Sequence, residues 1–543
     1  MKLKQFLFSA ALLASMNAIG QSVPTHEMYV DFGITERTDI VSALDKWQPG
    51  DNFSNDPDYQ DENFFISRVP LKSRFINQNT QANKNLNEEN NKNLCWCSPI
   101  GEMTKKWGPM PRYNFDGDNF NMWQYINIHA NWSNTWFRVP GTFNDVAHKN
   151  GVRTGCLYFI DWAEQVSATS SAGKMLAELC AKDGSGNFKY ARKLIQFLKY
   201  YGIDGLGLNP EGYWSTQLNE DFSSFLAECH KVAKEMNHPF HVEWYAFVSN
   251  TGGLNDNGCK LEIGANDKWF HKNGNPVTDV FFLNYNWSES GLQTSAEAAK
   301  SLGRSTYDVY AGFDQQGRGY GKYGNAGWTA LMRQPVSIVV WGAHDRSQLY
   351  AGSTEGGNSD LSVQNEYQKK QELLFTGGSR NVLRTPDITD DAITSSYSDL
   401  AKWHGYSKAV IEESALTELP FVTRFNLGNG LSFSKDGVVT FEHKWYNLGL
   451  QDLLPTWRWW IDNGDGTTIP ADPINCDFTF DDAWFGGSCL KLHGATSKSN
   501  IRLFSTKFNV ASASDEFTIV LKTLNGTDPV SYTHLTLPTI CSV

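Results

Sequence analysis

The chain has 543 residues and 40% hydrophobic residues, so it exceeds one ordinary compact domain, although a β/α barrel alone can use more than half of it. Its net charge of −12 and the lack of a concentrated Lys/Arg cluster exclude nucleic acid as a partner. Aromatic residues make up 13% of the chain, and their rings fill protein cores but also form flat binding platforms.

The amino terminus, MKLKQFLFSAALLASMNAIGQ (1–21), places Lys2 and Lys4 before a short apolar stretch and small residues. This order is typical of a secretory signal peptide over residues 1–20. We therefore expect an exported bacterial protein in the periplasm, on the cell surface or in the medium. No later run approaches the roughly 20 apolar residues of a membrane span, so none is expected.

Residues 21–115 are polar and rich in turn-forming residues. The stretch NQNTQANKNLNEENNKN (77–93) is nearly devoid of apolar side chains. Because such a composition buries little apolar surface, we expect a loop-rich N-terminal segment here.

From residue 116 to 440, short apolar runs alternate with helical patterns. Strands are predicted at 122–130, 153–160, 203–212, 240–248, 278–287, 307–319 and 335–344, and helices at 142–152, 172–182, 190–202 and 222–236. This alternation predicts a parallel sheet, and at least seven strands favour an α/β fold of the (β/α)8 TIM barrel type. No glycine fingerprint for a nucleotide follows the first strand, and we expect no cofactor.

Past residue 420, strands such as GVVTFEHKW (437–445) and CDFTFDD (476–482) follow one another without helices. This pattern predicts an appended C-terminal β-sandwich domain over residues 441–529, although LPFVTRFNLG (419–428) can also be read as the closing barrel strand. Residues 530–543 resemble the translation of a sequencing adapter. We therefore expect them to be foreign and the sandwich to be truncated.

Nine cysteines are scattered along the chain, and no spacing resembles a zinc site, so we expect no metal. Cys476 and Cys489 can form a disulfide or remain buried free thiols.

Asn209 and Glu211 follow the apolar part of YGIDGLGLNPEGYW (201–214). Alternate residues of a strand share a face, so the two side chains are expected to project together at the end of the strand, where barrel active sites lie. Cleavage of a glycosidic bond usually takes two carboxylates, whereas here one carboxylate is accompanied by an amide. That pair suits a substrate-assisted mechanism, in which a 2-acetamido group of the sugar attacks its own anomeric carbon.

Four motifs follow one another along the barrel region: D-G-x-x-x-N-x-E at 204–211, W-Y at 244–245, FFLNYNW at 281–287 and DVYAGFDQQGRG at 308–319. In this order the chain resembles glycoside hydrolase family 85, the endo-β-N-acetylglucosaminidases that cut the chitobiose core of N-glycans. The resemblance extends over residues 120–525.

The resemblance implies a retaining enzyme that hydrolyses the GlcNAc-β1,4-GlcNAc bond of N-glycans through an oxazoline. It implies that Glu211 is the general acid and then the base, that Asn209 binds the acetamido group, and that Tyr245 donates to the acetamido oxygen. A working acid near neutral pH needs a raised pKa, which we expect to come from burial of Glu211 among Trp214, Trp244 and Tyr245.

Further substrate-binding residues are also expected at this rim. Trp287 is expected to stack on a core sugar, and the other candidates are Trp244, Trp214, Asn284 and Asp314. The expected partners are N-glycans of glycoproteins or free oligosaccharides, and the protein is expected to be a monomer.

Two other functions remain open. One is a chitinase-like hydrolase of family 18, which uses the same chemistry but ordinarily has an aspartate where Asn209 stands. The other is a non-catalytic glycan-binding protein built on the same barrel.

Overall fold

The structure is a computed structural model. It describes residues 40–50, 66–98, 119–134, 136, 137, 139–162, 164–254, 257–318, 327–342, 361–390, 400–494, 499–509, 516, 518–520 and 522. The predicted signal peptide and the predicted foreign tail lie outside the described residues.

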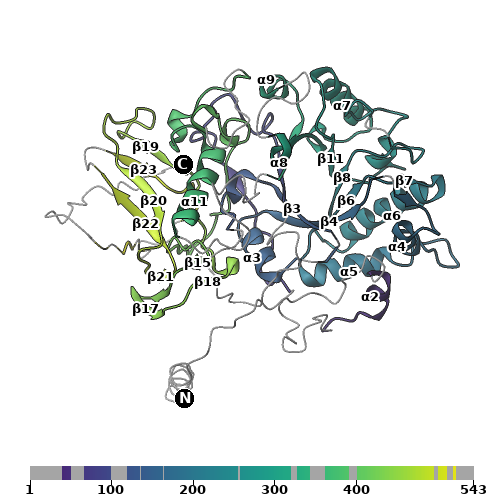
Figure 1. Ribbon diagram of the computed structural model, residues 1–543, viewed down its shortest axis with the longest axis horizontal. Coiled ribbons are helices and arrows are strands. Elements are labelled where there is room, and N and C mark those ends of the chain that lie inside the picture. The colour runs from purple at the N-terminus through teal and green to yellow at the C-terminus, as the bar shows by residue number, and fades with distance from the viewer. Residues whose placement is uncertain are drawn as a thin grey trace, which may run out of the picture.

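Eight parallel strands form a closed barrel (Figure 1). They are β2 (Leu94–Ser98), β3 (Ile128–Asn134), β4 (Arg153–Ile160), β6 (Gly205–Pro210), β8 (His241–Tyr245), β11 (Val280–Phe282), β12 (Val309–Asp314) and β13 (Ser337–Trp341). Each strand pairs with the next along the chain, and β13 closes the barrel by pairing with β2. The predicted TIM barrel is therefore confirmed.

The strand that closes the barrel was not expected from the sequence. β2 lies inside the segment that was predicted to be loop-rich, and it pairs with both β13 and β3. The alternative closing segment, 419–428, contains no strand. All five residues of β2 are buried. A run this short carries little periodic signal beside the polar stretch 77–93, and only pairing on both sides identifies it as a strand.

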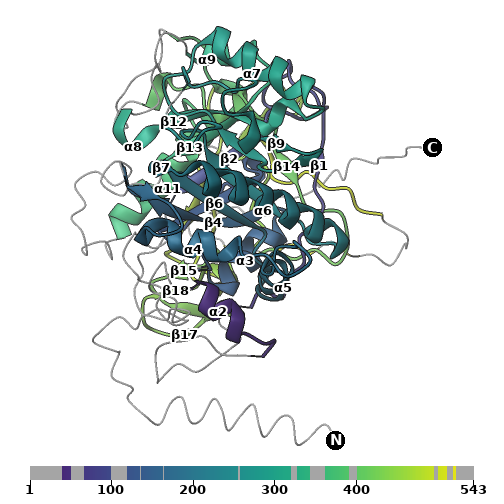
Figure 2. The same ribbon diagram turned by 90° about the vertical axis from the view of Figure 1, so that its right-hand side faces the viewer.

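Helices cover the outside of the barrel (Figures 1 and 2). The α-helices are α2 (Ile40–Lys46), α3 (Gly141–Lys149), α4 (Ser171–Leu179), α5 (Ala191–Tyr201), α6 (Thr216–Glu235), α7 (Glu289–Ser301), α8 (Gln315–Arg318), α9 (Trp328–Met332) and α11 (Leu361–Thr376). Serine side chains at 170, 215 and 288 cap α4, α6 and α7 by accepting backbone N–H bonds. Within the described part of the chain, none of the helices is long and apolar enough to cross a membrane.

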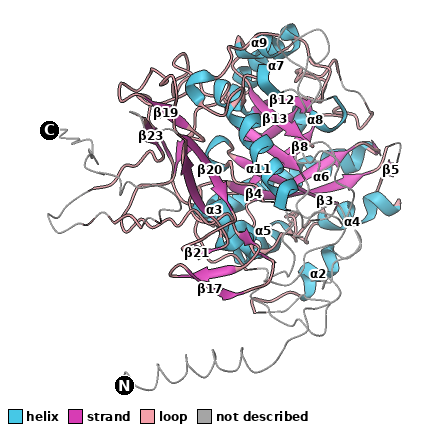
Figure 3. Ribbon diagram, turned by 60° about the vertical axis from the view of Figure 1, so that its left-hand side comes forward, coloured by secondary structure: helices cyan, strands magenta, loops and turns pink. Residues whose placement is uncertain are grey.

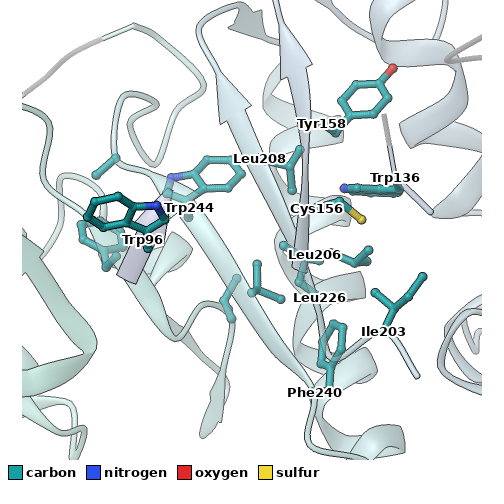
Figure 4. Packing of buried hydrophobic residues seen from close by; sticks show 14 of the residues in the cluster. Trp96, Trp136, Cys156, Tyr158, Ile203, Leu206, Leu208, Leu226, Phe240 and Trp244 are labelled. Atoms are coloured by element: carbon teal, nitrogen blue, oxygen red, sulfur yellow. The ribbon is translucent and has the colours of Figure 1, made fainter. Parts of the chain in front are cut away.

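The two faces of β6 differ in side-chain size. Leu206 and Leu208 lie in the large core between strands and helices, where Figure 4 shows them among other buried side chains. Gly205 and Gly207 face the barrel interior, because a Cβ added at either would collide with His241 or Glu243 of β8. The alternation Gly-Leu-Gly-Leu therefore sets which residues of β6 point into the barrel.

Antiparallel sheets follow the barrel in the chain, in agreement with the strands predicted for a β-sandwich there (Figure 3). Their strands are β15 (Asn429–Gly430), β16 (Phe433–Lys435), β17 (Val438–Phe441), β18 (Trp445–Tyr446), β19 (Trp460–Asp462), β20 (Asn475–Thr479), β21 (Phe485–Gly486), β22 (Cys489–His493) and β23 (Asn500–Arg502). Cys476 lies opposite Leu492 and Cys489 opposite Thr479, so the two cysteines are out of register and remain free thiols.

Short strand pairs complete the described structure. They are β1 (Phe75–Ile76) with β14 (Glu413–Ser414), β5 (Gln165–Val166) with β7 (Tyr213–Trp214), and β9 (His271–Lys272) with β10 (Asn275–Pro276).

Buried polar contacts join the C-terminal sheets to the barrel. Arg458 is fully buried and its Nη1 donates to Asn121 Oδ1 at 2.8 Å. Gln451 Nε2 donates to Asn119 Oδ1 at 3.2 Å and to the Phe120 carbonyl at 3.1 Å. Because unpaired buried polar groups are costly, these bonds fix the position of the C-terminal region against the barrel.

Candidate active site

Asn209 and Glu211 stand together where β6 ends. Asn209 is only 6% exposed, and its Nδ2 donates to Glu211 Oε2 at 3.2 Å. Asn209 follows Gly205 and Gly207 at the inward positions of the strand, so it points into the barrel. The amide and the carboxylate therefore share one direction at the mouth of the barrel, as the i, i+2 spacing predicts.

Neighbouring rim segments hold the chain that carries Glu211. The β5–β7 pair ties the segment after β6 to the segment after β4, and Tyr213 N donates to the Glu164 carbonyl at 2.7 Å. On the other side, Trp214 N donates to the Gly252 carbonyl at 2.8 Å. A Cβ at Gly212 would lie 2.6 Å from the Glu164 carbonyl oxygen, so glycine permits this close approach. Glu211 is thus fixed from both sides.

Tyr245 ends β8, the strand next to β6, and is partly buried. Its ring packs edge-on against Phe282 with centroids 4.9 Å apart. Burial raises the pKa of the Tyr245 hydroxyl, and the negative charge of Glu211 raises it further. The hydroxyl therefore stays protonated at any working pH and remains a hydrogen-bond donor beside the carboxylate.

The pKa of Glu211 is raised above its ordinary value. Burial is the largest cause, the hydrogen bond from Asn209 opposes it, and the negative charge of Asp161 adds to the rise. Asp161 is exposed directly after β4. A raised pKa keeps more Glu211 protonated toward neutral pH, which a general acid requires.

The three predicted tryptophans are buried in the core and do not line the barrel mouth. Trp244 is fully buried and stacks on Trp269 at 3.8 Å, and Trp214 packs beside both. Trp244 precedes Tyr245, so it points to the opposite face of β8. Trp287 is also fully buried, and its Nε1 donates to the Gly312 carbonyl at 2.9 Å. None of the three offers an exposed face to a sugar in this structure.

Asn284 and Asp314 lie at the ends of β11 and β12. Asn284 is buried with a left-handed φ of 66°, and its Oδ1 accepts from Tyr285 N at 2.6 Å. Asp314 lies 3.8 Å from Arg318 Nε, and its charge also raises the pKa of Tyr245. Asp314 thus belongs to the surroundings of Tyr245, whereas Asn284 mainly shapes the turn after β11.

Sequence reasoning missed the aromatic residues that are exposed at the rim. Trp162, directly after Asp161, is 61% exposed. Its ring meets Phe247 edge-on at 5.2 Å, and Phe247 lies parallel to Tyr245 at 5.9 Å. Tyr285 is partly exposed, with the Arg318 guanidinium 5.6 Å from its ring centre. The position of Trp162 right after a predicted strand was the available signal.

A buried imidazole–carboxylate pair lies on the inner face of β8, below Tyr245. His241 Nε2 is 2.6 Å from Glu243 Oε1, and Gly155 leaves room for this carboxylate. A Cβ at Gly155 would come within 2.6 Å of the same oxygen. The described residues hold no group of three or more His, Cys, Asp or Glu side chains that could bind a metal ion.

A family model described as glycosyl hydrolase family 85 matches residues 104–433. The cytosolic endo-β-N-acetylglucosaminidase of Gallus gallus is 23% identical over 88% of this chain and 55% of its own length. The human protein of the same name is 23% identical over 71% of this chain and 45% of its own. The chain thus spans about half the length of the curated relatives that it matches.

Among solved structures, the glycoside hydrolase domain of Endo-D from Streptococcus pneumoniae superposes with a TM-score of 0.72. The two are 25% identical, and the match covers 87% of this chain and 68% of that domain. The barrel and the sheets that follow it therefore have a counterpart in a solved glycoside hydrolase.

The comparisons contradict the predicted export. Six curated relatives, from four vertebrates and from Arabidopsis thaliana, all carry the word cytosolic in their names. These names contradict the prediction of a periplasmic, surface or secreted protein, which is therefore wrong. That prediction rested on residues 1–21 alone, which lie outside the described residues.

Proposed function

Because the chain belongs to glycosyl hydrolase family 85, we propose that it is an endo-β-N-acetylglucosaminidase acting on the GlcNAc-β1,4-GlcNAc bond in the core of N-glycans. The relatives that carry this activity in their names support the proposal. N-glycans of glycoproteins, or the free oligosaccharides, are the proposed substrates.

One observation carries the proposed mechanism: an amide and a carboxyl group with a raised pKa, hydrogen-bonded to each other at 3.2 Å, share the mouth of the barrel with a protonated tyrosine. Asn209 Nδ2 donates to Glu211, and Asn209 Oδ1 is the atom that we propose as the acceptor for the substrate. A 2-acetamido group has an N–H that needs an acceptor, here Asn209 Oδ1, and a C=O that needs a donor, here the Tyr245 hydroxyl.

In the first step, Asn209 Oδ1 accepts the acetamido N–H, and Tyr245 donates its hydroxyl to the acetamido oxygen. These bonds hold that oxygen below the anomeric carbon. The oxygen attacks as Glu211 gives its proton to the glycosidic oxygen. The bond to the leaving GlcNAc breaks, and an oxazolinium ion remains.

In the second step, Glu211 is a carboxylate and takes a proton from water. The water oxygen attacks the anomeric carbon, the oxazolinium ring opens, and the acetamido group is restored. Two inversions give net retention. Asn209 supports the ring throughout, because its carbonyl accepts from the nitrogen whose positive charge grows.

The family 18 alternative is less well supported, because the family model that matches is that of family 85. A non-catalytic glycan-binding role is less well supported because it would not need the raised pKa of Glu211 or its contact with Asn209.

A glycopeptide bearing one high-mannose or processed N-glycan tests the proposal. Mass spectrometry is expected to show peptide that retains a single GlcNAc. Cleavage of chitin oligomers alone would support the family 18 alternative, and binding without turnover would support the non-catalytic one.

A further inference from the structure

We propose that Trp162 and Phe247 form the platform for the sugar on the leaving-group side of Glu211, namely the GlcNAc that stays on the protein. This inference rests on the proposed function, and it assigns recognition of the protein-linked sugar to residues outside the acid, amide and tyrosine. It also replaces the platform that the sequence placed at Trp287, which is buried.

Trp162 is suited to stacking because most of its surface is open. It is 61% exposed, the largest fraction among the exposed tryptophans of the described residues. The edge-on contact with Phe247, at an interplanar angle of 65°, holds the indole against a second ring. A large aromatic ring that packs against a neighbouring ring and stays mostly exposed can serve as a binding platform for the apolar face of a pyranose.

The pair spans the end of the strand that carries Glu211. β6 lies between β4 and β8 in the barrel. Trp162 follows β4 and Phe247 follows β8, yet their ring centres are 5.2 Å apart. The contact between the two rings therefore bridges the segments on either side of β6, across the end of that strand. Glu211 directly follows the end of β6, so the aromatic pair lies beside the acid. In agreement with this position, the charge of Asp161, next to Trp162, raises the pKa of Glu211.

Depth in the barrel separates the platform from the acetamido site. Asn209 is the last inward residue within β6, and Tyr245 ends β8. Trp162 and Phe247 come after their strands and so lie further toward the mouth. The ring of Phe247, nearer the mouth, lies parallel to the ring of Tyr245, which belongs to the acetamido site. A GlcNAc held by Asn209 and Tyr245 would thus direct its glycosidic oxygen past Glu211 toward the platform.

The position next to the acid identifies the occupant. Glu211 must reach the glycosidic oxygen, so the sugar beside it is the one bonded through that oxygen. The rest of the glycan leaves the reacting GlcNAc from the opposite end of its ring. The platform therefore meets the leaving GlcNAc rather than the mannose-containing part.

Two substrates distinguish binding of the leaving GlcNAc at Trp162 and Phe247 from binding of the acetamido group at Asn209 and Tyr245. An intact glycopeptide needs the leaving-group site, whereas the oxazoline of the released glycan reaches water without a leaving sugar. Trp162→Ala is expected to lower kcat/KM for the glycopeptide about tenfold, mainly through KM. Hydrolysis of the oxazoline is expected to stay within about twofold, and transfer from the oxazoline to a GlcNAc acceptor is expected to fall with the glycopeptide reaction.

Trp162→Phe keeps a ring and is expected to recover most of the activity. Trp484→Ala is the matched control, since Trp484 is 41% exposed next to β21 in the C-terminal sheets. Equal losses of kcat/KM for the glycopeptide and the oxazoline in Trp162→Ala, or no loss for either, would contradict the proposed platform. If the unchanged protein used neither substrate, the proposed function itself would fail, so the two failures are distinguishable.

Discussion

The inner and outer faces of β6 and β8 show how one pair of strands serves two purposes. Outward residues, Leu208 and Trp244 among them, are large, apolar and buried against helices. Inward positions hold glycines and a His–Glu pair, and they end in Asn209 and Tyr245. The outer face supplies buried apolar packing, and the inner face carries the residues that we propose for the chemistry. Adjacent residues such as Trp244 and Tyr245 therefore have different functions because a strand alternates its faces.

The largest expected effect is on the inner face. Glu211→Gln removes the proton that the leaving oxygen needs and is expected to lower kcat on an intact glycopeptide about a thousandfold or more. Binding of the glycopeptide by calorimetry should persist, because the amide keeps the size of the side chain. Glu235→Gln on the surface of α6 is the control. Retained turnover would remove Glu211 from the mechanism.

The outer face is tested by Trp244→Ala, which leaves a cavity beside Trp269 and Trp214. We expect the free energy of unfolding to fall by about 3–5 kcal/mol in denaturant titrations. Folded enzyme should keep its KM, because the ring does not reach the barrel mouth. A raised KM with unchanged stability would instead make Trp244 a sugar contact.

Tyr245→Phe changes only the hydroxyl at the inner face and keeps the packing against Phe282. Loss of one donor to the acetamido oxygen is expected to lower kcat about tenfold in steady-state assays. Tyr307→Phe is the matched control, because its hydroxyl bonds the Glu89 carbonyl before β12 begins. Equal activities of the two variants would argue against the assigned donor role.

The smallest effect is expected at Asp161. Its charge raises the pKa of Glu211, so Asp161→Asn should lower that pKa. In the proposed mechanism Glu211 acts in its protonated form, so kcat/KM is expected to fall as pH rises through the pKa of Glu211. The alkaline limb of the pH profile should therefore move to lower pH, with the maximum rate nearly unchanged. A thousandfold loss of rate would instead identify Asp161 as a second catalytic carboxylate.

The sequence by itself determined most of the barrel and the Asn209–Glu211 pair at its mouth. Alternating apolar runs and helical patterns located seven of the eight strands, since burial on both faces leaves a strong local signal. The spacing of Asn209 and Glu211 determined their common direction, because period two is a property of any strand. The same rule applied to Trp244 and Tyr245 already implies that only one of them faces inward.

Only the tertiary structure decided how the barrel closes and which aromatic rings are exposed. β2 is a strand because β13 and β3 bond to it, and such pairing joins segments far apart in the chain. Trp162 and Trp287 both follow barrel strands, yet one is open and the other is buried under Phe313. Exposure depends on what the remaining chain packs against each ring, and no local pattern encodes that.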